Sequence, residues 1–600
     1  MLNGHPGPWN PGIQSQVPVE LRHLCTIFRP ENVLSSIAGV AELRGLTGFS
    51  AAELVVFRPQ RLVLHELLIR VTADFAVPDG WRIEDLGINF RAMATLILMR
   101  YIAPEMDAVT AAFELARRRL RDIIHTALST VAPESAPAAA PAARSAASRL
   151  FSRIARRRSI TDAVDERSWG PHQVAECERL ARTAADSLEE AAYRALARVM
   201  AALFTLHGRA WGARELIVSL ATDLACNAYG SDAVGRAIEP LLQRAARSEC
   251  FGLLAPQERP VVINTKGPSA SGKSTLRPLQ KKLAGDIGVR WNDFALISPD
   301  IWRKQLLDYG ALGNEYKYAG AFTAEELQII DQKLDRYMTR KYQRGDMSHL
   351  LIDRFRFDSF APDSDEAGSN LLTRFGQTVY LFFMITPPES LVERAWTRGL
   401  EVGRYKAVDD TLAHAVEAYT GMPEFFFTWV RRTDKRIQFE FLDNSVRLGE
   451  RPRTIAFGDN GTFNLLHVKG LLDIARYGRV NVDATNPALL YANRELLAPL
   501  HNTGFLRQCV DEFRVINFAD RATGRIYLRL ESGTPILIDN EPLQSAIADP
   551  DTMAGVRSVA PSALGGAVPA GEDAQYLCRS QSTSTAPTLG EWGSASPQSR

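Results

Sequence analysis

The stretch VVINTKGPSASGKST, residues 261–275, decides the fold that we expect for this chain. It satisfies the pattern G-x-x-x-x-G-K-[ST] through Gly267, Gly272, Lys273 and Ser274. Glycines let the backbone curl until successive N–H groups point inward at phosphate oxygens. The lysine of such a loop reaches the β- and γ-phosphates, and the hydroxyl that follows it holds Mg²⁺. The pattern therefore predicts a phosphate-binding loop.

A phosphate-binding loop needs a buried strand before it and a helix after it. Three β-branched residues, 261–263, follow the break at Arg259-Pro260 and read as a short buried strand. The residues after the motif read as a helix that ends near Gly285, although Pro278 in its first turns should kink it. In this context we expect the following residues to bind ATP: Gly267, Pro268, Ser269, Ala270, Ser271, Gly272, Lys273, Ser274 and Thr275.

From residue 251 onward, the sequence alternates apolar strand-like runs with helical patterns. The candidate strands are residues 261–265, 294–298, 349–353, 379–386 and 437–443. Alternating strands and helices predict a parallel sheet covered on both faces, with ligands at the carboxyl ends of the strands. We therefore expect an α/β fold, a P-loop kinase whose parallel sheet is covered by helices on both faces, preceded by an all-α N-terminal region.

Local composition divides the chain further. A Pro/Ala-rich run and an Arg-rich run read as a linker, and the two ends of the chain are too poor in apolar residues to build a core. We expect a disordered N-terminus (1–20), a helical domain (21–131), an Ala/Pro/Arg-rich linker (132–160), a helical region (161–250), the kinase domain (251–475), a small C-terminal extension with a hairpin (476–545) and a disordered tail (546–600).

Overall composition argues against several classes of protein. The 600 residues carry a net charge of +1, so no overall charge attracts nucleic acid or a membrane. The six cysteines form no C-x-x-C pair, which argues against a zinc site or a disulfide framework and suits a reducing compartment. No apolar run approaches the ~20 residues of a membrane helix, and the first residues do not read as a secretory signal. We expect a cytoplasmic protein without a transmembrane segment, with export as an effector without a cleaved signal peptide as the alternative.

Phosphoryl transfer to a hydroxyl group needs a base for the hydroxyl proton and cations for the moving phosphoryl group. The base should follow the second strand, where the sequence reads FALISPDIWRKQ. Asp300 comes just past that strand, and Arg303 and Lys304 follow one turn later. These cations would keep the carboxylate ionised. Asp300 could equally cap the next helix, so this residue taken alone leaves both roles open.

Four pieces of the sequence between residues 261 and 465 resemble the zeta-toxin family of P-loop kinases: GPSASGKST, SPDIWRK, ITPPESLVERAWTRGLEVGRYKAVDD and FLDNSVR. The resemblance implies that Asp300 activates the acceptor hydroxyl. It also implies that Arg398 and Arg404 form a lid over the transferring phosphoryl group, where planar guanidinium groups suit charge spread over several oxygens. An antitoxin or chaperone-like partner is a further implication.

Two other residues are alternatives for the lid, and the remaining site residues are less well defined. Arg394 or Lys406 could replace one of the lid arginines. Asp353, at the end of the third strand, could hold Mg²⁺ through water together with Ser274, or it could instead contact the acceptor. We expect three residues to bind the acceptor: Arg303, Glu326 and Arg354.

The sequence departs from the zeta-toxin pattern at two places. The third strand is followed by Arg354, Phe355 and Arg356, where the family has Gly-Thr, and these arginines favour an anionic acceptor. The interval between Lys273 and Asp300 is longer than in zeta toxins and is similar to that of type III effector kinases of the same fold, which phosphorylate NAD.

These features predict an ATP-dependent kinase, a phosphotransferase with an alcohol group as acceptor, that uses ATP and Mg²⁺. The resemblance implies a nucleotide-linked small molecule as acceptor, with UDP-N-acetylglucosamine first and NAD second. Two alternatives stay open. One is a polynucleotide 5′-hydroxyl kinase, for which the arginines between residues 149 and 158 would bind a nucleic acid, although a solvated basic linker is the favoured explanation of those arginines. The other is a non-catalytic ATP-binding interaction protein.

Overall fold

The computed structural model describes residues 6–132, 169–208, 211–354, 371–565, 575–577 and 587–593. The chain divides into two compact units. The sheet unit consists of Met1–Pro18, Ile69–Ala92 and Gly252–Arg600, and the helical unit consists of Val19–Leu68 and Met93–Phe251. The expected boundary near residue 251 is therefore incomplete, because part of the N-terminal region belongs to the sheet unit.

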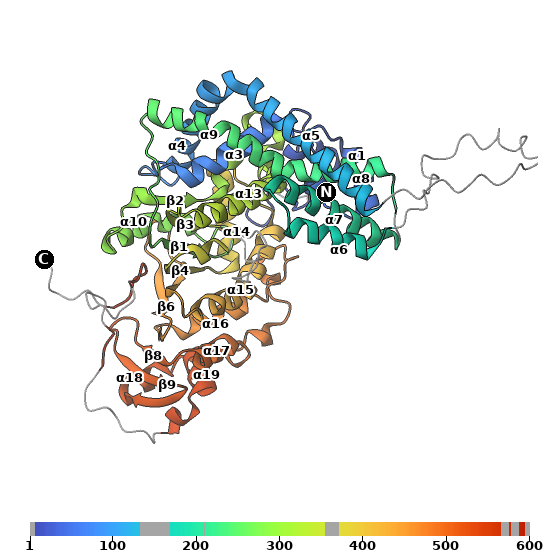
Figure 1. Ribbon diagram of the computed structural model, residues 1–600. Helices are drawn as coiled ribbons and strands as arrows, with labels where there is room; N and C mark the ends of the chain where they lie inside the picture. The colour runs from blue at the N-terminus through green and yellow to red at the C-terminus, as the bar shows by residue number, and fades with distance from the viewer. Residues whose placement is uncertain are drawn as a thin grey trace, which may run out of the picture. The chain divides into compact units, whose positions relative to one another are not determined.

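The sheet unit is built on one sheet of ten strands, four of which lie side by side in Figure 1 as β2, β3, β1 and β4. The order across the sheet is β10-β9-β8-β7-β6-β5-β4-β1-β3-β2. The strands are β1 (Val261–Lys266), β2 (Phe294–Ile297), β3 (His349–Asp353), β4 (Thr378–Ile385), β5 (Arg436–Asp443), β6 (Arg453–Asp459), β7 (Thr462–Leu465), β8 (Val515–Ala519), β9 (Ile526–Glu531) and β10 (Thr534–Ile538).

The five strands expected from the sequence are β1 to β5, each within one residue of the expected bounds. All of the pairings that these five strands make with one another are parallel. The expected parallel sheet is thus only part of the sheet, because β6 pairs with β5 in the antiparallel direction and starts a second half that is mostly antiparallel. The C-terminal extension is thus not a separate small domain. Its hairpin of β9 and β10 continues the same sheet.

Helices pack on both faces of the parallel part. Leu276 and Leu283, beside and within α10 (Arg277–Asp286), join one core cluster with Ile263 of β1 and Phe382 of β4. On the other face, the ring of Phe426 in α15 (Val408–Val430) lies edge-on to those of strand residues. The other helices of this unit are α11 (Arg303–Leu306), α12 (Ala319–Phe322), α13 (Ala324–Gln343), α14 (Pro388–Val402), α16 (Val468–Tyr477), α17 (Gly504–Glu512), α18 (Asn540–Ala546) and α19 (Pro550–Val559).

The N-terminal segment was expected to be disordered, but residues 6–18 are part of the sheet unit. Trp9 packs against the apolar cluster that contains Val392 of α14 and Leu412 of α15. The carbonyl of Pro11 accepts a hydrogen bond of 3.4 Å from Lys317 Nζ. The composition of this segment is poor in apolar residues, yet one tryptophan and a few backbone hydrogen bonds hold it on a neighbouring surface.

The expected disordered tail also contains ordered residues. Helix α19 lies within it, and residues 587–593 bind the sheet near β5 and β6. The buried carboxylate of Glu440 accepts hydrogen bonds from Leu589 N (2.6 Å), Gly590 N (3.0 Å) and Thr454 Oγ1 (2.7 Å). Trp592 fills a small core with Phe457. Burial raises the pKa of Glu440 to about 7, although its three donors oppose that rise.

Glu440 is expected to make stability fall as the pH rises from about 4.5 to about 7. In that interval the folded chain keeps a proton on Glu440 that the unfolded chain has released, so raising the pH favours unfolding. Glu440→Gln removes this dependence on pH. As the pH rises through the interval, the free energy of unfolding of the variant should increase by roughly 3 kcal/mol relative to that of the wild type. Thermal unfolding of both proteins at several pH values measures the difference. Parallel curves would contradict the assignment, and the exposed Glu450→Gln should give such curves.

The described part of the helical unit contains helices and, apart from one bridge between Val33 and Phe57, no strand pairing. Helices α3 (Pro59–Asp74) and α4 (Asp85–Ile97) each belong partly to this unit and partly to the sheet unit. The arginines between residues 149 and 158 lie outside the described residues. The other helices of this unit are α1 (Ile37–Thr47), α2 (Ala51–Leu54), α5 (Met106–Val131), α6 (Pro171–Arg182), α7 (Ser187–His207), α8 (Arg214–Ala225) and α9 (Ser231–Ser248).

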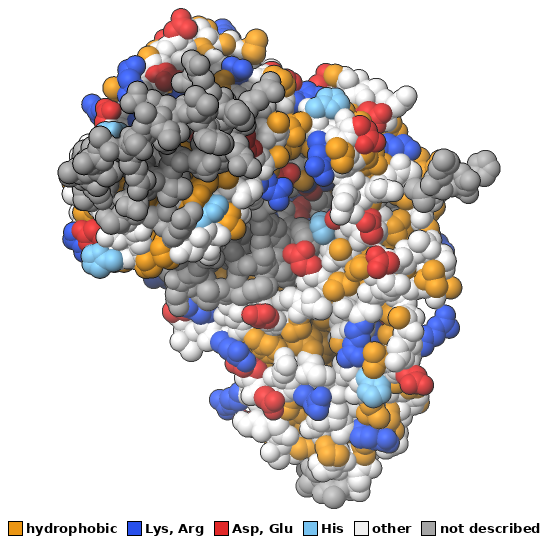
Figure 2. All heavy atoms as spheres, turned by 90° about the vertical axis from the view of Figure 1, so that its right-hand side faces the viewer, with side chains coloured by type: hydrophobic (Ala, Val, Ile, Leu, Met, Phe, Trp, Pro, Cys, Tyr) orange, Lys and Arg blue, Asp and Glu red, His pale blue; other side chains and the backbone are white. Residues whose placement is uncertain are grey.

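The helical stretch Asp85–Val131 is long and apolar enough to cross a membrane by length and composition, which we did not expect from the sequence. Buried core helices of soluble proteins pass the same test, so the stretch is weak evidence for a membrane span. On the face drawn in Figure 2, basic and acidic side chains are interspersed over the described residues, in keeping with the small net charge.

Candidate active site

The expected phosphate-binding loop, residues 267–275, connects the end of β1 to a 3-10 turn, Lys273–Leu276, which leads into α10. Lys273 Nζ donates to the carbonyls of Gly267 and Pro268, both at 3.0 Å. Burial lowers the pKa of Lys273, against the pull of Asp353 and Asp300. The expected kink at Pro278 does not arise, because α10 begins at Arg277 and the proline occupies its first turn, where no helix hydrogen bond is lost.

Residues beyond the motif hold this loop in place. Asn444, directly after β5, donates from Nδ2 to the carbonyl of Ser271 at 2.7 Å. Thr386, directly after β4, donates to the same carbonyl at 3.3 Å and is itself hydrogen-bonded to Tyr419. Asn444 belongs to the stretch FLDNSVR that carries part of the resemblance, but the sequence did not reveal this contact. Residues directly after the two neighbouring strands thus hold the loop at the carbonyl of Ser271.

Gly272→Ala is expected to weaken ATP binding at least about tenfold. Gly272 has φ +91°, and a Cβ there would lie 2.4 Å from Asn444 Nδ2, so the alanine must push the supporting side chain away from the loop. Titration with a fluorescent ATP analogue measures the affinity. Gly288→Ala is the matched control, since its φ of +75° imposes similar backbone strain while nothing lies within 4 Å of its Cβ position. Equal affinities in the two variants would show that the Asn444 contact is unimportant.

The two residues expected at the metal site lie in direct contact. Ser274 Oγ donates to Asp353 Oδ2 at 2.8 Å, and Asp353 ends β3, which is paired in parallel with β1. Within the part of the chain that the structure describes, no three His, Cys, Asp or Glu side chains gather into a metal cage. Mg²⁺ does not need one, because it usually takes one or two protein oxygens, with water and phosphate as its remaining ligands. The pair fits Mg²⁺ in that mode.

Asp300 lies in a short turn, Pro299–Trp302, just past β2, and is half-exposed. Its Oδ1 accepts from Arg303 Nε at 2.9 Å, and its Oδ2 accepts from Arg404 Nη2 at 2.6 Å. Burial alone would raise the pKa of Asp300, but Arg404 and Arg303 outweigh it and hold that pKa well below its usual range. The carboxylate is therefore ionised over the whole physiological range.

The two expected lid arginines stand on either side of the end of α14. Burial, with the like charge of Arg404 close by, lowers the pKa of Arg398 to about 10. The buried Nε of Arg398 has no hydrogen-bond partner among the described residues. Asp300 raises the pKa of Arg404. Both arginines are near enough to Lys273 to affect its pKa, so the fold brings the expected cations and carboxylates to one end of the parallel strands.

The two alternatives for the lid have other partners. Arg394 Nη2 donates to the carbonyls of Asn444 (2.7 Å) and Val446 (3.0 Å), which ties α14 to the segment after β5. Lys406 contacts His414 and lies 3.3 Å from a carboxylate oxygen of Asp410. Burial lowers the pKa of Lys406 to about 8, against the pull of that carboxylate.

The expected acceptor-binding residues do not form one group. Arg303 Nη1 donates hydrogen bonds to Gly320 O (2.7 Å) and Thr323 Oγ1 (2.8 Å), and its Nε donates to Asp300. Arg303 therefore positions the carboxylate of Asp300. Glu326 is fully buried in the first turns of α13. The acceptor role of Arg354 needs correction, since this residue lies buried between two aspartates of α13.

Arg354 forms a structural ion-pair cluster. Its guanidinium lies 2.5 Å from Asp331 Oδ1 and 2.7 Å from Asp335 Oδ1, and only 2% of its side chain is exposed. Burial raises the pKa of Asp335 to about 7, against the pull of Arg354. The position of Arg354 next to Asp353, the proposed metal ligand, suggested an acceptor-binding role. Its side chain instead pairs with the two aspartates of α13.

Comparisons with known proteins add little to this picture. A scan against protein families finds no match, and a search of curated proteins finds none either. Among solved structures, the chain is similar to one from the characterisation of the PezAT chromosomal toxin-antitoxin system of the human pathogen Streptococcus pneumoniae. That match has 16% identity and a TM-score of 0.23, and it covers 35% of this chain and 75% of the other. At this TM-score the match supports no conclusion about function.

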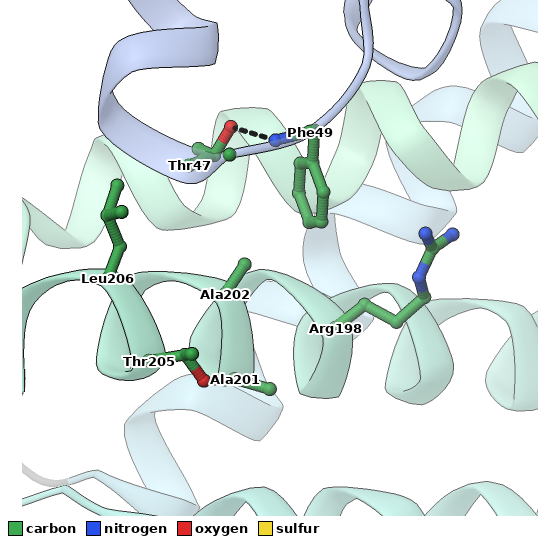
Figure 3. A pocket seen from close by; sticks show the side chains of 8 residues that line it. Thr47, Phe49, Arg198, Ala201, Ala202, Thr205 and Leu206 are labelled. Atoms are coloured by element: carbon green, nitrogen blue, oxygen red, sulfur yellow. Dashed lines mark hydrogen bonds between the residues drawn. The ribbon is translucent and has the colours of Figure 1, made fainter.

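A separate open groove lies in the helical unit, between the end of α1 and α7 (Figure 3). Phe49 points toward α7, and Arg198 lies over its ring at 5.5 Å from the centroid. The backbone N–H of Phe49 donates to Thr47 Oγ1 at 3.2 Å. The groove contains none of the residues that the sequence marked for chemistry.

Proposed function

We propose that this protein is an ATP-dependent kinase that transfers the γ-phosphoryl group to a hydroxyl of a nucleotide-linked small molecule. The observation that carries the proposal is the convergence of Lys273, the Ser274–Asp353 pair and the Asp300–Arg404 pair at the carboxyl ends of parallel strands. This set contains a phosphate-binding cation, oxygen ligands, a carboxylate and a lid. Phosphoryl transfer is catalysed chiefly by positioning and by electrostatic stabilisation, which such a set supplies.

Each residue then has a distinct task. The loop N–H groups and Lys273 bind the β- and γ-phosphates, and Arg398 and Arg404 stabilise charge on the transferring phosphoryl group. Ser274 and Asp353 would hold Mg²⁺, which would supply positive charge beside the phosphates of ATP. Asp300 accepts a hydrogen bond from the acceptor hydroxyl and orients it. Its low pKa makes it a weak base, which suffices where the transition state is loose and the hydroxyl proton leaves late.

The acceptor class rests on the resemblance described above. UDP-N-acetylglucosamine is the first candidate, and NAD is the second. A binding protein that uses ATP only to order its structure would need the loop and the metal pair, but it would have no use for a carboxylate held between two arginines.

The test is transfer from γ-labelled ATP with Mg²⁺ by the full chain, against UDP-N-acetylglucosamine, NAD, small sugars and a 5′-hydroxyl oligonucleotide. We expect label on a nucleotide-linked acceptor and its loss in Lys273→Ala. Lys281→Ala is the matched control, because Lys281 lies on α10 close to the loop but is half-exposed and 3.4 Å from Asp79. Bound ATP without transfer to any acceptor would favour a binding protein, and label on the oligonucleotide would favour a polynucleotide kinase.

A further inference from the structure

Two cations and a phenol lie close to Asp300 without taking part in the pairs described so far. They are Arg91 on α4, Lys304 on α11 and Tyr309 shortly after it. The first turns of α4, through Ala92, belong to the sheet unit together with the active site. Arg91 is thus contributed by a segment about 170 residues before the phosphate-binding loop and outside the region of resemblance.

The geometry places Arg91 beside the turn that carries Asp300. A Cβ built on Gly87 of α4 would lie 3.0 Å from Arg91 Nη1 and 3.7 Å from the side chain of Ile301, the residue after Asp300. The guanidinium of Arg91 and the side chain of Ile301 therefore both lie next to the open position at Gly87. Lys304 Nζ lies 5.8 Å from the ring centroid of Tyr309.

These groups are close enough to affect one another's titration. Burial lowers the pKa of Lys304, and the charges of Arg91 and Arg404 lower it further. Burial also lowers the pKa of Arg91, with Tyr309 acting in the opposite direction. Burial raises the pKa of Tyr309, while Arg303, Arg404 and Arg91 oppose that rise. The like charges repel one another, so the arrangement is unfavourable until an anion joins it.

The charges of this cluster are not balanced. Arg303 and Arg404 share the carboxylate of Asp300. In contrast, neither Arg91 nor Lys304 has an ion pair with any carboxylate in the described ranges of the chain. Arg91 is half-buried, and Lys304 is exposed. A half-buried guanidinium without a counter-charge can bind an anion, and its planar N–H donors suit phosphate oxygens.

We propose that Arg91, Lys304 and Tyr309 form an anion subsite that binds a phosphate or diphosphate group of the acceptor, distinct from the phosphoryl group being transferred. This inference rests on the proposed function and narrows it, because it requires an acceptor that already carries phosphate. Arg91 supplies paired donors, Tyr309 supplies a neutral donor, and Lys304 supplies charge at the exposed side. Free sugars and dephosphorylated nucleosides would lack the group that these residues recognise.

The kinetic test compares the full chain with Arg91→Gln and Lys304→Gln, using the acceptor identified from the panel. We expect KM for the acceptor to rise about tenfold in Arg91→Gln and less in Lys304→Gln, while KM for ATP changes less than twofold. Arg82→Gln, an exposed arginine just before α4, is the matched control and should behave as the wild type. Unchanged acceptor KM in both variants, with transfer intact, would overturn the subsite.

A binding test separates failure of the subsite from failure of the proposed function. Inorganic pyrophosphate is titrated calorimetrically into Lys273→Ala, in which the phosphate-binding loop lacks its lysine. We expect residual binding that weakens about tenfold when Arg91→Gln is added and stays unchanged when Arg82→Gln is added. If no acceptor is ever found but this loss occurs, the subsite stands and the kinase assignment fails. Pyrophosphate binding that is absent or insensitive to Arg91 would overturn the subsite whatever the catalytic result.

Discussion

Asp300→Asn is expected to lower kcat for phosphoryl transfer by about 10²–10⁴-fold while leaving ATP affinity undiminished. The amide keeps the size of the side chain and can still accept one hydrogen bond, from Arg303 or from Arg404. It cannot take the hydroxyl proton, and it leaves the two arginines without their shared negative charge. Steady-state transfer assays give kcat, and calorimetric titration with a non-hydrolysable ATP analogue gives the affinity.

Asp293→Asn is the matched control for this prediction. Asp293 stands at the other end of β2 and pairs with Arg290 at 2.9 Å, an ion pair with the same three-residue spacing as Asp300 and Arg303. It lacks a second arginine of the lid, so its loss should change kcat less than twofold. Transfer at the wild-type rate in Asp300→Asn would remove Asp300 from the mechanism, and equal losses in both variants would indicate general damage around β2.

Arg354→Met is expected to destabilise the folded protein by about 3–5 kcal/mol, because it removes the buried cation that pairs with Asp331 and Asp335. The carboxylates of Asp331 and Asp335 then repel each other, and at least one must bind a proton to stay buried. Denaturant unfolding followed by fluorescence measures the change. Any molecules that remain folded should retain the wild-type KM for the acceptor, since Arg354 lies in the protein interior.

Arg344→Met provides the contrast for the buried cluster. Arg344 pairs with Asp346 at 3.1 Å, but both side chains are at least half exposed. Such surface ion pairs contribute about 0–1 kcal/mol to the free energy of unfolding. A stable Arg354→Met protein with a raised acceptor KM would reverse our correction and return Arg354 to the binding site.

The sequence predicted the strand–loop–helix arrangement around residues 267–275 and the five parallel strands because their signals are local. A glycine-rich loop between a β-branched run and a helix needs only adjacent residues to be recognised. The buried parallel strands are short apolar runs, and their ends are marked by prolines, glycines and charged residues. The position of Asp300 just past β2 was predicted for the same reason, while its catalytic role stays a prediction.

The partners of charged side chains could not be predicted in this way. Arg354 was expected at the acceptor, but its two aspartates lie 19 and 23 positions earlier in the chain and become neighbours only when α13 packs beside β3. Arg91 lay in a region to which we assigned no chemistry. Its proximity to Ile301 follows from the packing of α4, for which no short pattern exists.

Order at the two ends of the chain was also missed, because composition averages over a segment while packing depends on single residues. Trp9 anchors the N-terminal segment, and Trp592 with two backbone N–H groups anchors residues 587–593. A stretch rich in Gly, Pro, Ser and Thr can therefore be held by one large ring when a complementary surface exists elsewhere.

The attachment of residues 587–593 beside Glu440 has a consequence for biosynthesis. These residues are translated about 290 positions after Asp300, which at typical elongation rates is roughly 15–60 s later. Until then the nascent chain carries all of the proposed catalytic side chains, but the Glu440 carboxylate lacks two of its hydrogen-bond donors and the apolar cluster around Phe457 of β6 lacks Trp592. A premature stop codon shortly before residue 587 would consequently yield a protein with an intact nucleotide motif that is prone to capture by chaperones and to degradation.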